Sequence, residues 1–195
     1  MKNKENLYAS IPYVDKKVSR IFAGTAFSPI QDGADGTDFF EAALANGINA
    51  FDTARVYMEA EHSFGNWLEK SGRREEVVIL SKCGHPDAMW NKRVNEKEMR
   101  KDLKKSLEEL KTDYIDIYQL HCVPQCYRPG DGTGMYECLV KAKEEGKIRH
   151  IGITAHKLGV AEEIVESGLY ETLQYPFSYL SSEREKALVR ACKEK

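Results

Sequence analysis

The sequence alternates short apolar or β-branched runs with longer amphipathic patterns, six times in succession. The first run is 18–25, and each run is followed by a stretch with helical spacing of its apolar residues. Six β-then-α units in a row predict a parallel sheet whose strands are joined by right-handed crossovers. The five further strands are expected at 48–52, 77–82, 114–121, 148–154 and 171–177. The fold class is therefore α/β, with either a doubly wound open sheet or a barrel.

Helix signals separate these strands. Asn95 with Glu98, and Ser182 with Glu185, have the spacing of an N-cap residue and its capping-box partner. After Asn95, apolar residues recur on one helical face that we expect to pack on the sheet: Met99, Leu103, Leu107 and Leu110. The remaining helices are expected at 38–46, 62–72, 135–145, 160–167 and 182–195.

Two observations favour the barrel. No GxGxxG or GxxxxGK[ST] pattern follows the first strand, which argues against a dinucleotide-binding open sheet or a P-loop. Polar residues instead close several strands, and in a (β/α)₈ TIM barrel the carboxyl ends of the strands carry the catalytic residues. These residues are Asp52, Lys82, His121, Thr154 and Gln174. The sequence thus predicts a TIM-barrel type fold with about six of its eight βα units in this chain.

Composition limits the function classes. The chain has 195 residues, of which 42% are hydrophobic, and a formal net charge of −2. This composition is typical of one globular domain. The chain has no excess of basic residues, so nucleic-acid or membrane binding is not expected. No signal-peptide pattern and no run of about 18 apolar residues occurs, so the expected location is cytoplasmic. We expect residues 1–17 to be a polar N-terminal extension and residues 18–195 to be an incomplete barrel domain.

The five cysteines do not predict a disulfide framework, because their number is odd and no secretion signal precedes them. Cys122 and Cys126 lie close to His121 in a loop rich in proline and glycine. A metal site there would need a fourth ligand and usually has tighter spacing. We therefore expect free thiols and no metal site.

The residues at three successive strand ends suggest a reaction. Neighbouring parallel strands lie about 4.8 Å apart, so Asp52, Lys82 and His121 can meet, together with Tyr57 from the loop after Asp52. A lysine ammonium beside a tyrosine stabilises the phenolate and is expected to lower the tyrosine pKa. The aspartate would keep the lysine charged, and the histidine could hydrogen-bond to a substrate oxygen. The set predicts a general acid directed at a carbonyl group.

Each of these residues also has an ordinary structural interpretation. Asp52 could cap a turn, Lys82 could extend to solvent, His121 could be satisfied within its loop, and Tyr57 could pack on the surface. Their combination at three neighbouring strand ends favours function.

The motifs that carry these residues resemble those of the aldo-keto reductases. The matching segments are FDTARVY with Asp52 and Tyr57, VVILSKCG with Lys82, DYIDIYQLHC with His121, GKIRHIGIT with Thr154, and LQYPFSYL with Gln174. They occur in the family's order from about residue 18 onward.

The resemblance implies a TIM-barrel oxidoreductase that reduces small aldehydes or ketones, or runs the reverse reaction, with NADPH or, less often, NADH. It implies that Tyr57 is the general acid, that Lys82 and Asp52 tune it, and that His121 orients the carbonyl. Thr154 and Gln174 match positions that hold the nicotinamide carboxamide, with Asp52 adjoining the cofactor.

Three departures from the family pattern stand out. Ala155 follows Thr154 where the family usually has an asparagine, and Met58 follows Tyr57 where it commonly has a glycine. The third departure is that strands seven and eight, which carry much of the family's cofactor binding, have no counterpart here. We expect the chain to be part of a longer reductase; the alternatives are closure by a homo-oligomer and a degenerate relative.

Two other functions remain open at this point. The first is a non-catalytic regulatory or binding protein on the same scaffold, which Ala155 and the absent cofactor loops favour. The second is a lyase or isomerase on a TIM barrel, which often binds a metal through carboxylates or histidines; the sequence has no such ligand cluster.

Overall fold

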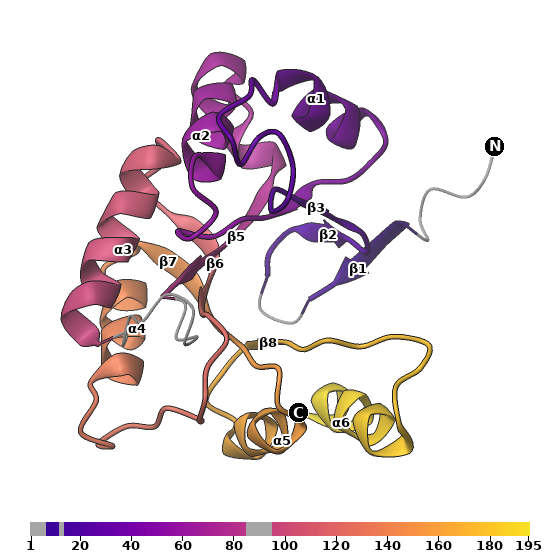
Figure 1. Cartoon of the computed structure of the whole chain (residues 1–195), viewed down its shortest axis with the longest axis vertical. Coiled ribbons are helices and arrows are strands. Elements are labelled where there is room, and N and C mark those ends of the chain that lie inside the picture. Colours follow the sequence, from indigo (N-terminus) through magenta and orange to yellow (C-terminus); the bar gives the residue numbers. More distant parts are fainter. Residues whose placement is uncertain (1–6, 12–13, 85–94) are drawn as a thin grey trace.

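Six parallel strands form one sheet in sequence order, and the sheet curls like part of a barrel (Figure 1). The computed structural model describes residues 7–11, 14–84 and 95–195. The strands are β3 (Phe22–Gly24), β4 (Ala50–Asp52), β5 (Val78–Cys83), β6 (Ile115–Leu120), β7 (Ile148–Thr154) and β8 (Thr172–Gln174). The curl is strong enough for the Gln174 amide of β8 to donate a hydrogen bond to Asp52 of β4, at 3.3 Å. The predicted barrel-type α/β fold is confirmed as a half-barrel.

One helix follows each strand of this sheet, and the helices cover its outer face (Figure 1). They are α1 (Thr37–Ala45), α2 (Ala60–Ser71), α3 (Glu96–Glu109), α4 (Met135–Glu144), α5 (Leu158–Ser167) and α6 (Glu183–Glu194), with a short 3₁₀ helix at Arg74–Glu76. The predicted alternation of six strands and six helices is thereby confirmed. Because the crossover helices lie on the outer face, the inner face at the carboxyl ends of the strands remains available for a site.

The predicted helix starts are confirmed at two positions. The Asn95 side chain accepts a hydrogen bond from the Glu98 amide at 3.0 Å and so caps α3. Ser182 and Glu185 form a complete capping box at the start of α6, in which each side chain bonds to the other residue's backbone. Three residues of the apolar stripe on α3 are fully buried, as expected for packing on the sheet: Met99, Leu103 and Leu110.

The single strand predicted at 18–25 is wrong. The segment is split between β2 (Lys17–Ser19), which pairs antiparallel with β1 (Tyr8–Ser10), and β3 of the main sheet. The Ser19 hydroxyl donates to the Ile21 carbonyl at 2.7 Å and accepts from the Ala50 amide, which stabilises the change of direction between the two strands. Part of the expected N-terminal extension therefore forms a hairpin; residues 1–6 and 12–13 lie outside the described residues.

The hairpin covers the inner face of the sheet near the amino ends of its strands. Val18 of β2 forms a buried cluster with inward-facing residues of three strands: Ala50, Val78, Leu80 and Ile117. Buried apolar area of this kind stabilises the fold by about 25 cal/mol per Å². One end of the inner face is therefore filled by apolar side chains.

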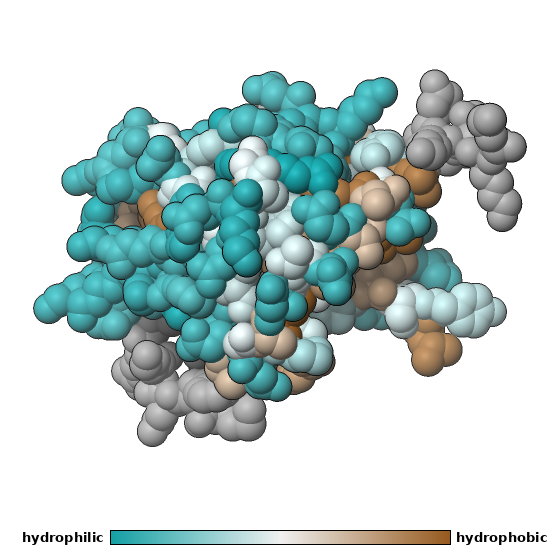
Figure 2. Space-filling view, turned by 90° about the horizontal axis from the view of Figure 1, so that it is seen from above, coloured by the Kyte–Doolittle hydropathy of each residue, from teal (hydrophilic) through white to brown (hydrophobic). Residues whose placement is uncertain are grey.

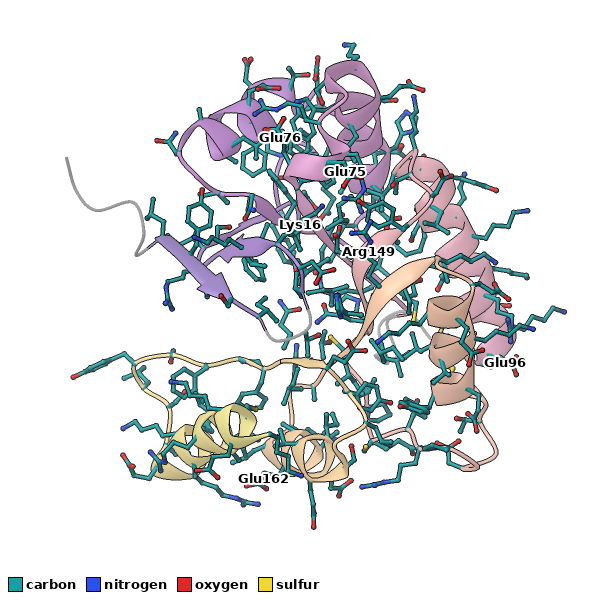
Figure 3. All side chains as sticks on the ribbon, turned by 180° about the vertical axis from the view of Figure 1, so that it is seen from behind. Lys16, Glu75, Glu76, Glu96, Arg149 and Glu162 are labelled. Carbon is teal, nitrogen blue, oxygen red and sulfur yellow. The ribbon has the colours of Figure 1, made fainter. Side chains whose placement is uncertain are left out.

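Ion pairs fix the same amino-terminal end. Asp116 is 2% exposed and accepts hydrogen bonds from Arg74 at 2.7 Å and from the Ile79 amide at 3.0 Å. Figure 3 shows Lys16, Glu75 and Arg149 near one another although they come from separate segments. Lys16 lies 3.8 Å from both Glu75 and Asp116, so the network joins the hairpin connection to the sheet.

The surface is uneven in character. In Figure 2, hydrophilic atoms cover the side that carries α3, and brown apolar atoms gather on the opposite side. The large apolar side chains with the greatest exposure are Phe27, Tyr179 and Leu180, followed by Ile21, Met58 and Phe177. Within the described residues, no helix combines the length and the apolarity needed to span a bilayer.

Gly65 tests the packing of α2 on α3. A Cβ atom at Gly65 would lie 1.9 Å from the Glu109 carbonyl oxygen, a backbone atom that has little freedom to move. We expect Gly65→Ala to lower the free energy of unfolding by roughly 3 kcal/mol, since overpacking of rigid contacts costs about this much. Urea denaturation followed by circular dichroism measures the change.

Gly159→Ala is the matched control. Gly159 lies in α5 with nothing within 4 Å of its Cβ position. Alanine there should raise stability by about 0.5–1 kcal/mol through helix propensity. Equal effects of the two substitutions would contradict the close approach of α2 and α3.

Candidate active site

Five predicted site residues lie at the carboxyl ends of neighbouring strands. Asp52, Thr154 and Gln174 are the last residues of β4, β7 and β8, Lys82 is the last but one of β5, and His121 follows β6 directly. Strand register places Lys82 opposite Gln119 and Thr154 opposite Gln174. The structure thus brings these residues to one end of the inner face, away from the apolar hairpin.

Lys82 is the centre of the arrangement. Its side chain is 2% exposed, and its ammonium donates to Asp52 Oδ1 at 2.6 Å and to the Thr53 carbonyl at 2.8 Å. A buried cation is stable only where a counter-charge and hydrogen-bond acceptors replace water. The carboxyl end of β4 supplies both acceptors, from Asp52 and from the residue that follows it.

Tyr57 and His121 complete the group. The Lys82 ammonium lies 3.5 Å from the Tyr57 hydroxyl and 5.0 Å from the centre of its ring. The His121 ring meets the Tyr57 ring edge-on, with the ring centroids 6.0 Å apart. The candidate general acid and the three residues predicted to surround it, Asp52, Lys82 and His121, therefore lie together in the structure.

The expected direction of the Tyr57 pKa is wrong for this structure. Burial of the phenol, the nearby charge of Asp52 and the proximity of Cys122 raise the pKa of Tyr57 to about 12. Lys82 does not reverse this because its ammonium is 2.6 Å from Asp52, closer than it is to the Tyr57 hydroxyl. Burial also lowers the pKa of Lys82, against the attraction of Asp52. Tyr57 therefore retains its proton at neutral pH, as a proton donor must.

A second ionic group holds the loop that carries Tyr57, and sequence reasoning missed it. Glu61 at the start of α2 is completely buried and bonds to Arg55 at 2.5 Å and to the Ser81 hydroxyl at 2.6 Å. Burial raises the pKa of Glu61, while Ser81 and Arg55 oppose this shift. Since Arg55 lies between Asp52 and Tyr57, the contact ties that loop to the outer face of β5.

The loop cysteines form no metal site within the residues that the structure describes. No group of three or more histidine, cysteine or acidic side chains there has the arrangement of metal ligands. All five cysteines are free thiols. Cys122 Sγ instead lies 3.6 Å from Nε2 of His156, a pair that the sequence spacing did not reveal.

Comparison with known proteins identifies the family. The profile of the Aldo/keto reductase family matches residues 23–195. The chain belongs to the aldo/keto reductase family.

Individual relatives agree with this membership. The chain is 30% identical to the protein tas of Escherichia coli, over 89% of this chain and 61% of that protein. It is 32% identical to the NADH-specific methylglyoxal reductase of Escherichia coli, over 76% of this chain and 49% of that enzyme. It is 31% identical to the glyoxal reductase of Bacillus subtilis, over 73% and 48% respectively. The chain thus spans about half to three fifths of the length of these relatives.

A solved structure supports the fold. A putative aldo-keto reductase from Pseudomonas aeruginosa superposes with a TM-score of 0.78 at 22% identity, over 95% of this chain and 72% of that one. Aldo-keto reductases are TIM barrels, and the curled six-stranded sheet has the form of half of such a barrel.

The residues expected to hold a nicotinamide carboxamide fit that group chemically. Thr154 Oγ1 accepts a hydrogen bond from the Cys122 amide at 2.6 Å and still has its own proton to donate. The Gln174 amide nitrogen donates to Asp52, so its carbonyl oxygen can accept. One donor and one acceptor match the oxygen and the NH₂ of a carboxamide. Ala155 has no polar side-chain group to add to the site, and it is completely buried in the outer core.

Met58 stands where the aldo-keto reductase pattern commonly has glycine, and its backbone has a conformation that favours glycine. It has φ 46°, in the left-handed region that glycine adopts at least cost. Its side chain is 52% exposed, and its sulfur accepts a hydrogen bond from Gln31 at 3.7 Å. The thioether thus lies at the surface next to the candidate site and is held by the loop that follows β3.

The raised Tyr57 pKa is open to direct measurement. With ¹³Cζ-labelled tyrosine, we expect the resonance that Tyr57→Phe removes to stay unchanged up to about pH 11, beyond the ordinary tyrosine pKa of about 10. Asp52→Asn should lower its midpoint, because the second cause of the shift is removed. The sign for stability follows: the contribution of the protonated phenol is present below pH about 10 and is lost as the pH rises towards 12. A Tyr57 midpoint at or below 10 would contradict this geometry.

Proposed function

We propose that this chain carries the active site of an oxidoreductase that reduces the carbonyl group of a small aldehyde or ketone. The observation that carries the proposal is the buried Lys82–Asp52 pair, with the Lys82 ammonium 3.5 Å from the Tyr57 hydroxyl. The names of two relatives, a glyoxal reductase and a methylglyoxal reductase, favour small oxoaldehydes as substrates.

In this proposal Tyr57 is the general acid. Its hydroxyl donates a proton to the carbonyl oxygen as negative charge develops there, and its high pKa keeps it protonated until then. Lys82 stabilises the phenolate that remains, while Asp52 and the Thr53 carbonyl fix the ammonium. His121, edge-on to Tyr57, orients the carbonyl oxygen.

A bound NADPH, or alternatively NADH, would supply the hydride. Thr154 and Gln174 would hold its carboxamide and so set the nicotinamide against the inner face, with Asp52 adjoining it. The name of one relative specifies NADH, so both cofactors belong in the test.

Tyr57→Phe tests the assignment. It should reduce turnover of methylglyoxal by a factor of about 10²–10⁴, the usual contribution of a general acid, while cofactor binding persists. Loss of NADPH or NADH absorbance at 340 nm measures turnover, and quenching of tryptophan fluorescence measures binding.

Tyr114→Phe is the matched control, since Tyr114 precedes β6 at the opposite end of the sheet and bonds to Glu75. It should leave turnover unchanged. Cofactor binding without turnover in the unmodified protein would favour the alternative, a non-catalytic binding protein on this scaffold, and equal turnover of Tyr57→Phe would remove the general-acid role.

A further inference from the structure

A cysteine and a histidine from neighbouring strand ends meet beside the candidate active site. Cys122 follows β6 and His121, and His156 lies two residues beyond the end of β7. Their Sγ and Nε2 atoms are 3.6 Å apart, which is hydrogen-bond distance for sulfur. Cys122 is half-buried and His156 is exposed, so a small molecule can reach the pair.

The backbone holds Cys122 in this position. Its φ is 51°, in the left-handed region that is unfavourable for a side chain with a Cβ. Hydrogen bonds on either side of the Cys122 side chain maintain this conformation: its own amide donates to Thr154 Oγ1 at 2.6 Å, and the Val123 amide donates to the Thr154 carbonyl at 2.9 Å. The thiol is therefore placed by the end of β7, the same strand that leads to His156.

The electrostatic surroundings connect this thiol to the site. Cys122 lies close enough to contribute to the raised pKa of Tyr57, and it opposes the burial that lowers the pKa of Lys82. By the same reciprocity, the Lys82 ammonium stabilises a Cys122 thiolate. A partly exposed cysteine near a cationic group is the typical environment of a nucleophilic thiol.

We propose that Cys122 is a nucleophile that adds reversibly to the carbonyl carbon of small aldehydes, with His156 as its base. The Cys122 proton moves to Nε2 of His156, in the tautomer with its own proton on Nδ1. The S–C bond forms as the C=O π bond breaks, and the proton returns to the alkoxide oxygen. The product is a hemithioacetal, and the step needs neither an oxidant nor a reductant.

The choice of aldehyde rests on the proposed function; the nucleophilicity of Cys122 does not. A molecule whose carbonyl enters the space near Tyr57 comes close to the thiol as well. The adduct would occupy the entrance to the site, so that high aldehyde concentration would limit the reduction of the same compound.

Alkylation with iodoacetamide tests the nucleophile without cofactor or turnover. The folded chain is labelled at pH 7 and then digested, and mass spectrometry of the peptides measures labelling at each cysteine. Cys122 should be labelled at least about tenfold faster than Cys192, an exposed cysteine of α6. Although Cys192 is exposed, partial desolvation by its neighbours raises the pKa of its thiol, which makes it a slow internal reference. Cys122→Ser should abolish the fast labelling.

Two variants in the loop after β7 distinguish loss of the base from a general disturbance of the loop. His156→Gln should slow labelling of Cys122 by about tenfold, because the proton acceptor is lost. Lys157→Gln, the matched control at the next exposed position, should leave the rate within about twofold. Equal labelling of Cys122 and Cys192, or an unchanged rate in His156→Gln, would overturn the proposal.

Methylglyoxal at millimolar concentration tests the carbonyl step. Brief incubation should protect Cys122 from iodoacetamide more than Cys192, and dilution should restore labelling. Rapid alkylation without such protection would overturn the carbonyl addition. Because labelling is independent of reduction, failure of this proposal is distinguishable from failure of the proposed function.

Discussion

The buried Lys82–Asp52 ion pair is the interaction on which the rest of the site depends. An ammonium that is 2% exposed cannot be accommodated at a strand end without a charged partner, and Asp52 supplies one at 2.6 Å. The pair requires β4 and β5 to be adjacent. Asp52, the last residue of β4, lies opposite Leu80, and Lys82 follows two residues later on the same face of β5. It also contributes to the state of Tyr57, since the charge of Asp52 adds to the effect of burial in raising the pKa of the phenol. The same contact thus influences both the geometry of the site and the protonation of its groups.

The two faces of the sheet share the work of holding this geometry. On the inner face, polar side chains at the carboxyl ends lie above an apolar layer closed by the hairpin. On the outer face, Glu61 binds Arg55 and Ser81 and so anchors the segment between Asp52 and Tyr57. A tyrosine on a loop needs such support, because catalytic positions are set by rigid elements rather than by the loop itself. Glu61 thus holds the segment that carries Tyr57 against β5.

Much of the fold and the list of strand-end residues followed from the sequence, for a physical reason. Parallel strands end at one edge, and a period of two indicates which side chains face inward, so the sequence alone predicts where Asp52 and Lys82 lie. Other features depend on distances that no spacing encodes. The Tyr57 pKa depends on burial. In the sequence, nothing distinguishes Glu61 from Glu59, although the structure buries Glu61 and leaves Glu59 exposed. The hairpin was missed because its second strand continues almost directly into β3.

Backbone strain is distributed in the same way as the chemistry. In the described part of the chain, four residues other than glycine have positive φ, and three of them follow strands at the carboxyl edge: Phe27 after β3, Met58 after β4 and Cys122 after β6. Each such conformation costs of order 1 kcal/mol and persists only where the surroundings enforce it. Gln31 accepts from the Phe27 amide and donates to the Met58 sulfur, and Thr154 accepts from the Cys122 amide. The edge that carries the candidate site is therefore held in strained conformations by hydrogen bonds between neighbouring loops, while the amino-terminal edge is closed by apolar packing and ion pairs. Because of this division, the loops around Tyr57 can hold side chains such as Met58 and Cys122 on strained backbone without disturbing the packing of the sheet.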